Sequence, residues 1–362
     1  MTLKNSLEPK MTLSAVAKHL GVSRTTVSNA YNRPDQLSAR LREEIIEKAR
    51  ELGYHGPNAV GRLLRIGKTQ SIGLLFYDRF SAVFDDEFAL QLIQGIMVEL
   101  ERVGVSLLMV PTMTTQQESS QALGALVDGF IVFCESQEAS PVLETIRSRG
   151  LPLVAIDHHY DGIPMIGVDD CTGAKVAAQK VIERGHKNVI IVSIAFNVHN
   201  ERGFVDPGFV HEYPDRTPVR RIRGYSHVFN KADVQYRIFE TAQDDLVSPH
   251  ATGFAEQIID NLADATAIVC MADRLAIAIM DVARQKGLRI PEDLSIVGFD
   301  GIRSAQERSP ALSSICQRAD EKGRLAVRML LGDEPMESRI LGVSWLEGQT
   351  LGPVPGKNVT DT

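Results

Sequence analysis

The sequence predicts a small all-α headpiece followed by an α/β body of two doubly wound lobes, each built on a parallel sheet. Short amphipathic helices fill the first 56 residues, whereas buried apolar runs alternate with amphipathic helices from Ser71 onward. The chain has 362 residues, and 44% of them are apolar, which is enough for one small domain and a larger body with real cores.

Two short helices joined by a tight turn are predicted near the start of the chain. Thr12 and Ser23 are placed to cap the helix N-termini, and Gly21 ends the first helix because glycine accepts the left-handed conformation. Val27 and Ala30 would face the core. The other face of the second helix would carry side chains that can hydrogen-bond to base edges or phosphates: Arg24, Thr25, Thr26, Ser28 and Asn29. This pattern is typical of a DNA-reading helix-turn-helix.

The alternative is an ordinary helical hairpin, which also places two amphipathic helices around a glycine. The charge distribution adds a separate observation. Residues 1–68, which include a third predicted helix from Ser38 to Leu52, hold 12 Lys and Arg against 6 Asp and Glu, a net charge of +6. The remainder holds 27 against 40, a net charge of −13. A polyanion would be attracted to the first part and repelled by the second, which favours DNA binding.

The body contains short apolar runs of strand length with amphipathic helices between them. Strands are predicted at 71–76, 106–110, 129–133 and 153–156, and shorter ones around 166–168, 189–193, 267–271 and 295–299. Helices are predicted near 88–103, 116–127 and 142–149. Buried runs separated by helices indicate parallel sheets covered on both faces, and their number exceeds one sheet of normal size. Two lobes with a cleft between them are therefore expected.

Several classes of protein are disfavoured by the sequence. No apolar run is long enough to span a membrane, and the first ten residues, which we interpret as a disordered tail, lack an apolar stretch of secretory-signal length. No nucleophile elbow, P-loop, H-E-x-x-H or dinucleotide fingerprint is present, so we expect no enzyme and no cofactor. The cysteines are far apart and lack the paired spacing of a zinc site, so we interpret them as ordinary cytosolic thiols: Cys134, Cys171, Cys270 and Cys316.

The segment Y-H-G-P-N-A-V-G-R-L-L-R-I-G-K-T-Q-S-I-G-L-L, residues 54–75, resembles the lactose-repressor/galactose-repressor family of bacterial transcription regulators. So do G-L-R-I-P-E-D-L-S-I-V-G-F-D at 287–300 and P-A-L-S-S-I at 310–315, and the resemblance runs from Thr12 nearly to the C-terminus. It implies a periplasmic-binding-protein-like body with a ligand between its lobes. It also implies hinge-forming crossovers near residues 157–162, 290–291 and 316–320.

The resemblance implies roles for headpiece residues on DNA. Arg24, Thr25 and Asn29 match base-reading positions. The positions that match phosphate contacts are Ser23, Thr26, Ser28, Asn32 and Ser38.

A hinge helix follows, in which Asn58, Ala59 and Leu64 match minor-groove positions and Leu64 matches an intercalating wedge. The segment 57–64 is only about two turns long and contains Gly61, so we expect it to fold only on DNA. The alternative is an ordinary linker whose Leu63 and Leu64 pack on the body.

An effector site is expected where parallel strands end. The candidates by that rule are Tyr77, Phe84, Phe88, Asp157, His158 and Asp273. The resemblance adds that Asp273 accepts hydrogen bonds from the ligand and that Arg221 donates to it from the opposite lobe. Such a pair suits polar neutral ligands such as sugars or nucleosides. Alternatively, Asp273 caps the helix that follows it. Arg221 could instead be a surface salt-bridge partner, and Arg220 or Arg223 could be the arginine that matches the family position.

Two features depart from the common family pattern. Two residues, His55 and Gly56, separate Tyr54 from Pro57 where most members have one. A loop at 197–217 carries carboxylates and two histidines, which could be imagined as a metal site: His199, Glu201, Asp206, His211 and Glu212. Their spacing is irregular, so we predict a mobile polar lid and no metal.

These inferences predict a tail at 1–10, a helix-turn-helix headpiece at 11–56, a hinge at 57–69, an effector-binding and dimerisation body at 70–351, and a tail at 352–362. We expect a cytoplasmic, nucleoid-associated homodimer that represses a catabolic or uptake operon. Its partners would be a palindromic double-stranded DNA operator and a small polar effector, with no membrane. The alternatives are an activator or co-repressor-dependent regulator and, from another class, a sugar-binding uptake protein, which would need an export signal and no headpiece.

Overall fold

The computed structural model describes residues 11–56, 67–76, 80–111, 124–133, 141–196, 202–208, 216–242, 245 and 252–355. The chain forms two compact units, Met1–Thr69 and Gln70–Thr362. Several predicted features lie outside the described residues: the tail 1–10, the hinge residues Asn58, Ala59 and Leu64, Tyr77, most of the helix expected near 116–127, and His199 and His211 in the 197–217 loop.

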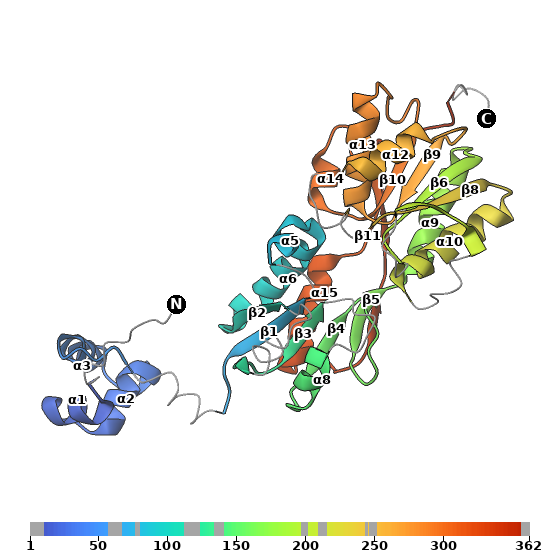
Figure 1. Ribbon diagram of the computed structural model, residues 1–362. Helices are drawn as coiled ribbons and strands as arrows, with labels where there is room; N and C mark the ends of the chain where they lie inside the picture. Colours follow the sequence, from blue (N-terminus) through green and yellow to red (C-terminus); the bar gives the residue numbers. More distant parts are fainter. Residues whose placement is uncertain are drawn as a thin grey trace. The chain divides into compact units, whose positions relative to one another are not determined.

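The headpiece consists of α1 (Leu13–Leu20), α2 (Arg24–Asn32), the 3-10 turn η1 (Pro34–Gln36) and α3 (Ala39–Glu51) (Figure 1). The predicted caps are confirmed, since Thr12 and Ser23 accept from backbone N–H groups in the first turns of α1 and α2, and Gly21 has φ 66°. Seven buried side chains form the core: Val16, Ala17, Val27, Ala30, Ile45, Ala49 and Tyr54.

Lobe 1 of the body is built on a sheet of the order β12-β5-β4-β3-β1-β2, in which every pair is parallel. Its strands are β1 (Ser71–Phe76), β2 (Ser106–Pro111), β3 (Phe130–Phe133), β4 (Leu153–Ile156), β5 (Met165–Val168) and β12 (Arg339–Leu341). One face packs against α6 (Glu87–Val103) and α15 (Ala319–Leu331), and the other against α8 (Pro141–Arg147). The short α5 (Phe80–Asp85) precedes α6.

Lobe 2 has a sheet of the order β13-β11-β10-β9-β6-β8-β7, parallel in the middle and antiparallel at both edges. Its strands are β6 (Asn188–Ser193), β7 (Gly203–Val205), β8 (Gln235–Glu240), β9 (Ala267–Cys270), β10 (Ser295–Asp300), β11 (Ser313–Cys316) and β13 (Ser344–Leu346). The helices α9 (Asp170–Glu183) and α10 (Thr217–Lys231) cover one face. The other face packs against α12 (Gly253–Asp260) and α13 (Asp273–Gln285), and α14 (Arg303–Glu307) follows β10. The doubly wound two-lobed body is thus confirmed.

Between the described helices and strands, the chain crosses from one lobe to the other at three places, and only one matches a predicted crossover. The predicted crossover at 316–320 is confirmed, because β11 belongs to lobe 2 and α15 to lobe 1. The predictions at 157–162 and 290–291 are wrong: the first segment joins β4 to β5 inside lobe 1, and the second precedes β10 inside lobe 2. The other two crossovers lie between β5 and α9 and between β12 and β13.

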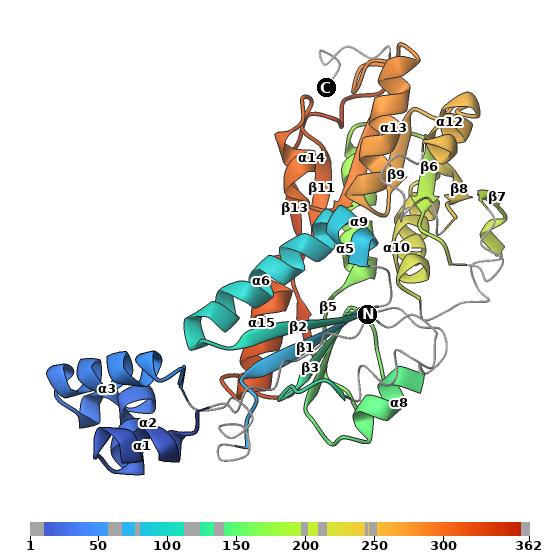
Figure 2. The ribbon, with the colours of Figure 1, turned by 60° about the vertical axis from the view of Figure 1, so that its left-hand side comes forward.

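In lobe 1, α6 and α15 pack very closely, side by side in both views (Figures 1 and 2). Two glycines permit this approach. A Cβ on Gly95 would lie 1.9 Å from the Asp320 carbonyl oxygen, and one on Gly323 would lie 2.3 Å from the Leu92 carbonyl oxygen. The last two elements of lobe 1, α15 and β12, follow β5 by more than 150 residues in the chain. Lobe 1 is therefore complete only when this late segment has been added.

Candidate DNA-reading surface and effector site

The N-terminus of α2 presents a polar surface whose position is set by local hydrogen bonds. The Ser23 hydroxyl accepts from the Thr26 amide at 3.0 Å and lies 2.8 Å from the Thr26 hydroxyl. Arg24 and Thr25 follow at once and are exposed, while Val27 and Ala30 anchor the opposite face of the helix in the core. The first turn of α2 therefore holds a long cationic side chain and a hydroxyl in solvent on a rigid element.

The other headpiece candidates lie further along α2 and at the start of α3. Asn32 donates to the Ser28 carbonyl oxygen at 3.0 Å, and Asn29 is half-buried. The exposed Ser38 hydroxyl accepts from the Leu41 amide at 3.3 Å. A hydroxyl that accepts in this way keeps its own proton for donation, so a capping serine suits a phosphate contact.

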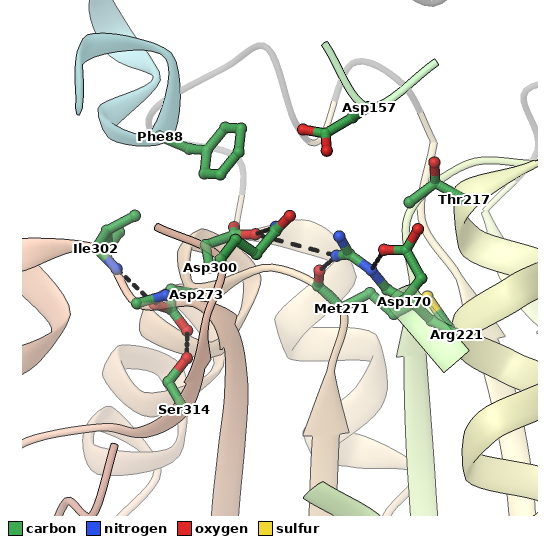
Figure 3. Close-up of polar contacts among 12 residues, drawn as sticks. Phe88, Asp157, Asp170, Thr217, Arg221, Met271, Asp273, Asp300, Ile302 and Ser314 are labelled. Carbon is green, nitrogen blue, oxygen red and sulfur yellow. Dashed lines mark hydrogen bonds and ion pairs between the residues drawn. The ribbon is translucent and has the colours of Figure 1, made fainter. Parts of the chain in front are cut away.

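In the body, Arg221 is the centre of a group of polar side chains at the carboxyl ends of lobe 2 strands (Figure 3). Its Nε donates to Asp170 Oδ1 at 2.9 Å, its Nη1 donates to the Met271 carbonyl oxygen, and Nη1 lies 4.0 Å from Asp300 Oδ1. The guanidinium also stacks over the Phe299 ring at 3.8 Å. These contacts bury Arg221, of which 6% of the side chain is exposed, and fix the direction of its planar group.

The polar contacts continue from Asp300 into lobe 1. Gln317, at the crossover after β11, donates from Nε2 to Asp300 Oδ1 at 2.5 Å. Its Oε1 accepts from Lys322 Nζ at 3.0 Å, and Lys322 also donates to both carboxylate oxygens of Asp157, at 2.6 and 2.8 Å. We call the six connected residues the interlobe cluster: Asp157, Asp170, Arg221, Asp300, Gln317 and Lys322.

Burial has a clear electrostatic effect in the interlobe cluster. It raises the pKa of Asp300 well above the ordinary aspartate value, although the nearby Arg221 lowers it. The lysine is fully buried, and its ammonium lies 5.1 Å from the centre of the Phe88 ring. Figure 3 shows Phe88 and Asp157, which belong to lobe 1, above Asp300 and Arg221, which belong to lobe 2.

Asp273 begins α13 and is buried beneath this surface. Its Oδ2 accepts from the Gly301 and Ile302 amides at 2.7 and 2.9 Å, and its Oδ1 accepts from the Ser314 hydroxyl at 2.5 Å. Both oxygens are therefore bonded within lobe 2, on the turn that follows Asp300. Burial raises the Asp273 pKa to about 6, despite three hydrogen bonds that favour the ionised form.

Replacing Asp273 with asparagine should remove a pH-dependent part of the stability. The folded-state pKa lies above the unfolded value of about 3.9, so this carboxyl stabilises the fold fully below pH 4 and loses that contribution as the pH rises through 6. Asparagine keeps an acceptor for the two amides and does not titrate. Urea unfolding from pH 4 to 7 should show wild type gaining up to about 2 kcal/mol over Asp273→Asn as the pH falls. Parallel pH profiles for the two proteins would contradict this assignment.

The structure brings some of the predicted effector residues together and separates others. Asp157, Arg221 and Phe88 belong to or contact the interlobe cluster, whereas Phe84 is 55% exposed on α5. His158 is half-buried beside Asp157. Sequence reasoning missed four residues: Asp170, Asp300, Gln317 and Lys322. The rule of strand ends points to Asp300 and Gln317, which follow the apolar runs of β10 and β11, but no local signal marks Lys322.

Comparison with known proteins identifies both units. Residues 12–58 match the model of bacterial regulatory proteins of the lacI family, and residues 178–349 match a periplasmic binding protein-like domain. An HTH-type transcriptional regulator of Mycolicibacterium smegmatis is 34% identical, over 95% of this chain and 97% of that protein. The chain belongs to the lacI family of HTH-type transcriptional regulators. The family predicted from the sequence is confirmed.

Two further likenesses agree with this assignment. The HTH-type transcriptional regulator IpsA of Corynebacterium glutamicum is 32% identical over 95% of this chain and 98% of that protein. The crystal structure of the lac repressor dimer bound to operator and the anti-inducer ONPF has a TM-score of 0.72 and 21% identity, covering 94% of this chain and 99% of that one, which supports the fold. This lacI-family protein is thus a DNA-binding transcriptional regulator with an effector-binding body. Within its described parts, no helix is long and apolar enough to cross a bilayer.

Proposed function

We propose that this regulator is a cytoplasmic repressor, without enzymatic activity, that a sugar or nucleoside releases from its operator. The interlobe cluster supports this class of effector, because the Arg221 guanidinium is held there among carboxylates at the carboxyl ends of strands. Hydroxyl groups can donate to the carboxylates and accept from the guanidinium at once. Arg221, Asp157 and Asp300 would contact the effector, Phe88 would cover it, and Asp273 would hold the turn that carries Asp300.

On DNA, we assign the headpiece to residues 11–56 and the hinge to 57–69, with the body from residue 70. Arg24, Thr25 and Asn29 would read bases, Ser23, Thr26, Ser28, Asn32 and Ser38 would contact phosphates, and Leu64 would enter the minor groove beside Asn58 and Ala59. The lac repressor structure is a dimer on its operator. By analogy we propose a homodimer on a palindromic site, because a two-fold protein matches two-fold half-sites.

The test is operator selection followed by release. The full chain would be used to select binding sites from random duplex DNA, and the selected site would be titrated with protein in the presence of sugars and nucleosides. A two-fold symmetric site and loss of binding with one compound support the proposal. A compound that strengthens binding would replace induction by co-repression, and a chain that selects no symmetric site would refute the DNA assignment.

Base reading by Arg24 predicts different results for two neighbouring substitutions. Arg24→Ala should relax the preference at one base pair of each half-site, because a bidentate arginine contact to guanine contributes about 1–3 kcal/mol of discrimination. Thr26→Ala should weaken binding to all sequences alike, because phosphate contacts carry no sequence information. The measurement is the selected-site profile of each variant. An unchanged profile for Arg24→Ala would remove it from the base-reading set.

A further inference from the structure

The cations of the interlobe cluster and its neighbour Arg220 already have carboxylate partners. All three protons of the Lys322 ammonium are directed to acceptors, namely the two oxygens of Asp157 and Gln317 Oε1. Because this lysine is fully buried, it cannot turn toward solvent to exchange one partner for another. A new anion could bind Lys322 only by displacing Asp157 or Gln317.

The two arginines are held in a similar way. Arg220 donates from Nε and Nη2 to Asp170 Oδ2 at 3.2 and 2.9 Å, while Arg221 takes Oδ1 of the same carboxylate. Only 5% of the Asp170 side chain is exposed, so separating it from both arginines would leave a buried charge without a partner. Arg221 also lies 4.0 Å from Asp300.

Among the described residues of the interlobe cluster and Arg220, positive charge does not exceed negative charge. Three cations, Arg220, Arg221 and Lys322, meet three carboxylates, Asp157, Asp170 and Asp300, with the Asp273 carboxylate directly beneath. If Asp300 binds a proton, the negative charge of Asp273 replaces that of Asp300, and the net charge of these residues is zero. A dianionic phosphate at this site would be desolvated next to carboxylates, which disfavours it strongly.

We infer that the effector site selects an uncharged polyhydroxyl compound and rejects the phosphate ester of the same compound. Hydroxyl groups can add to the existing ion pairs, because each can donate to a carboxylate that a cation already holds. A phosphate would bring its negative charge against the same carboxylates, which a neutral hydroxyl does not. The selectivity thus comes as much from carboxylates that repel the phosphate ester as from contacts with the neutral compound. This inference rests on the proposed effector function.

Matched ligand pairs test the selectivity. Calorimetry with the full chain would compare ribose with ribose 5-phosphate, glucose with glucose 6-phosphate, and adenosine with adenosine 5′-monophosphate. We expect a neutral member to bind and its ester to bind at least about 100-fold more weakly. An ester that binds as tightly as its neutral partner overturns the inference and leaves the proposed function intact. If no compound of either kind binds, the proposed effector class fails, and the inference fails with it.

Two substitutions test whether the paired carboxylates cause the weaker binding of the phosphate ester. Asp157→Asn removes the charged partner of Lys322, and Asp170→Asn removes the shared partner of the two arginines. In each variant the ratio of ester to neutral dissociation constants should fall at least about tenfold. Asp161→Asn is the matched control, since it makes the same change on the same loop at a fully exposed side chain and should keep the wild-type ratio. The inference is wrong if the variants that fold, as judged by cooperative thermal unfolding, also keep that ratio.

Discussion

Replacing Arg221 with methionine is expected to destabilise the body by about 3 kcal/mol. The substitution removes the donor to Asp170 Oδ1 and to the Met271 carbonyl oxygen, both of which are buried. Breaking a buried pair costs about 3–5 kcal/mol, and we expect the lower end because Arg220 still binds the other oxygen of Asp170. Urea unfolding of the body transition measures the change.

Arg223 supplies the control for this prediction. It lies on the same helix, two residues further on, and is exposed, so Arg223→Met should change the free energy of unfolding by less than about 0.5 kcal/mol. Adding Asp170→Asn to Arg221→Met should recover part of the loss, since the buried group left behind is then uncharged. Equal stability of the two methionine variants would show that the Arg221 pair does not stabilise the body.

Replacing Gly95 with alanine is expected to cost a similar amount, about 3 kcal/mol, by a different mechanism. The new methyl group would lie 1.9 Å from the Asp320 carbonyl oxygen, which belongs to the backbone of α15 and cannot move by a side-chain rotation. The two helices would have to separate, and the buried residues between α6, α15 and the sheet would lose contact. Thermal and urea unfolding would show the loss.

Gly124→Ala is the matched control, because a Cβ at that position would have no heavy atom of the described residues within 4 Å. Alanine there should leave stability unchanged or slightly raise it by restricting the unfolded chain. If Gly95→Ala unfolds at the same urea concentration as Gly124→Ala, the close packing of α6 on α15 is not needed for stability.

Much of the fold could be predicted because its signals are local. The apolar runs at 71–76 and 153–156 match β1 and β4 residue for residue, and the Thr12 and Ser23 caps depend only on neighbours within one helical turn. The wrong crossovers came from the family resemblance and not from a local signal. The segments 157–162 and 290–291 each connect elements of one lobe. The crossover between β12 and β13 was not predicted.

The candidate site was partly predictable for the same reason. Asp157 and Arg221 could be found from a strand end and from a family motif, but their partners could not. Lys322 pairs with Asp157 across 165 residues of sequence, and Arg221 reaches Asp170 across 51. In sequence, Lys322 looks like a solvated charge on an amphipathic helix. Only the fold shows that this position faces inward and that the ammonium is buried.

The return of the chain to lobe 1 after α15 has a consequence for synthesis. The ribosome releases residues 70–168 early, but α15 and β12 follow only after the main part of lobe 2 has been made. Until then, the nascent chain exposes the apolar surface of α6 and the sheet that Ala319, Ala326 and Val327 later cover. A premature stop before residue 319 would therefore leave a translated headpiece attached to an incomplete lobe, and such a fragment is expected to be removed by proteolysis before it can occupy an operator.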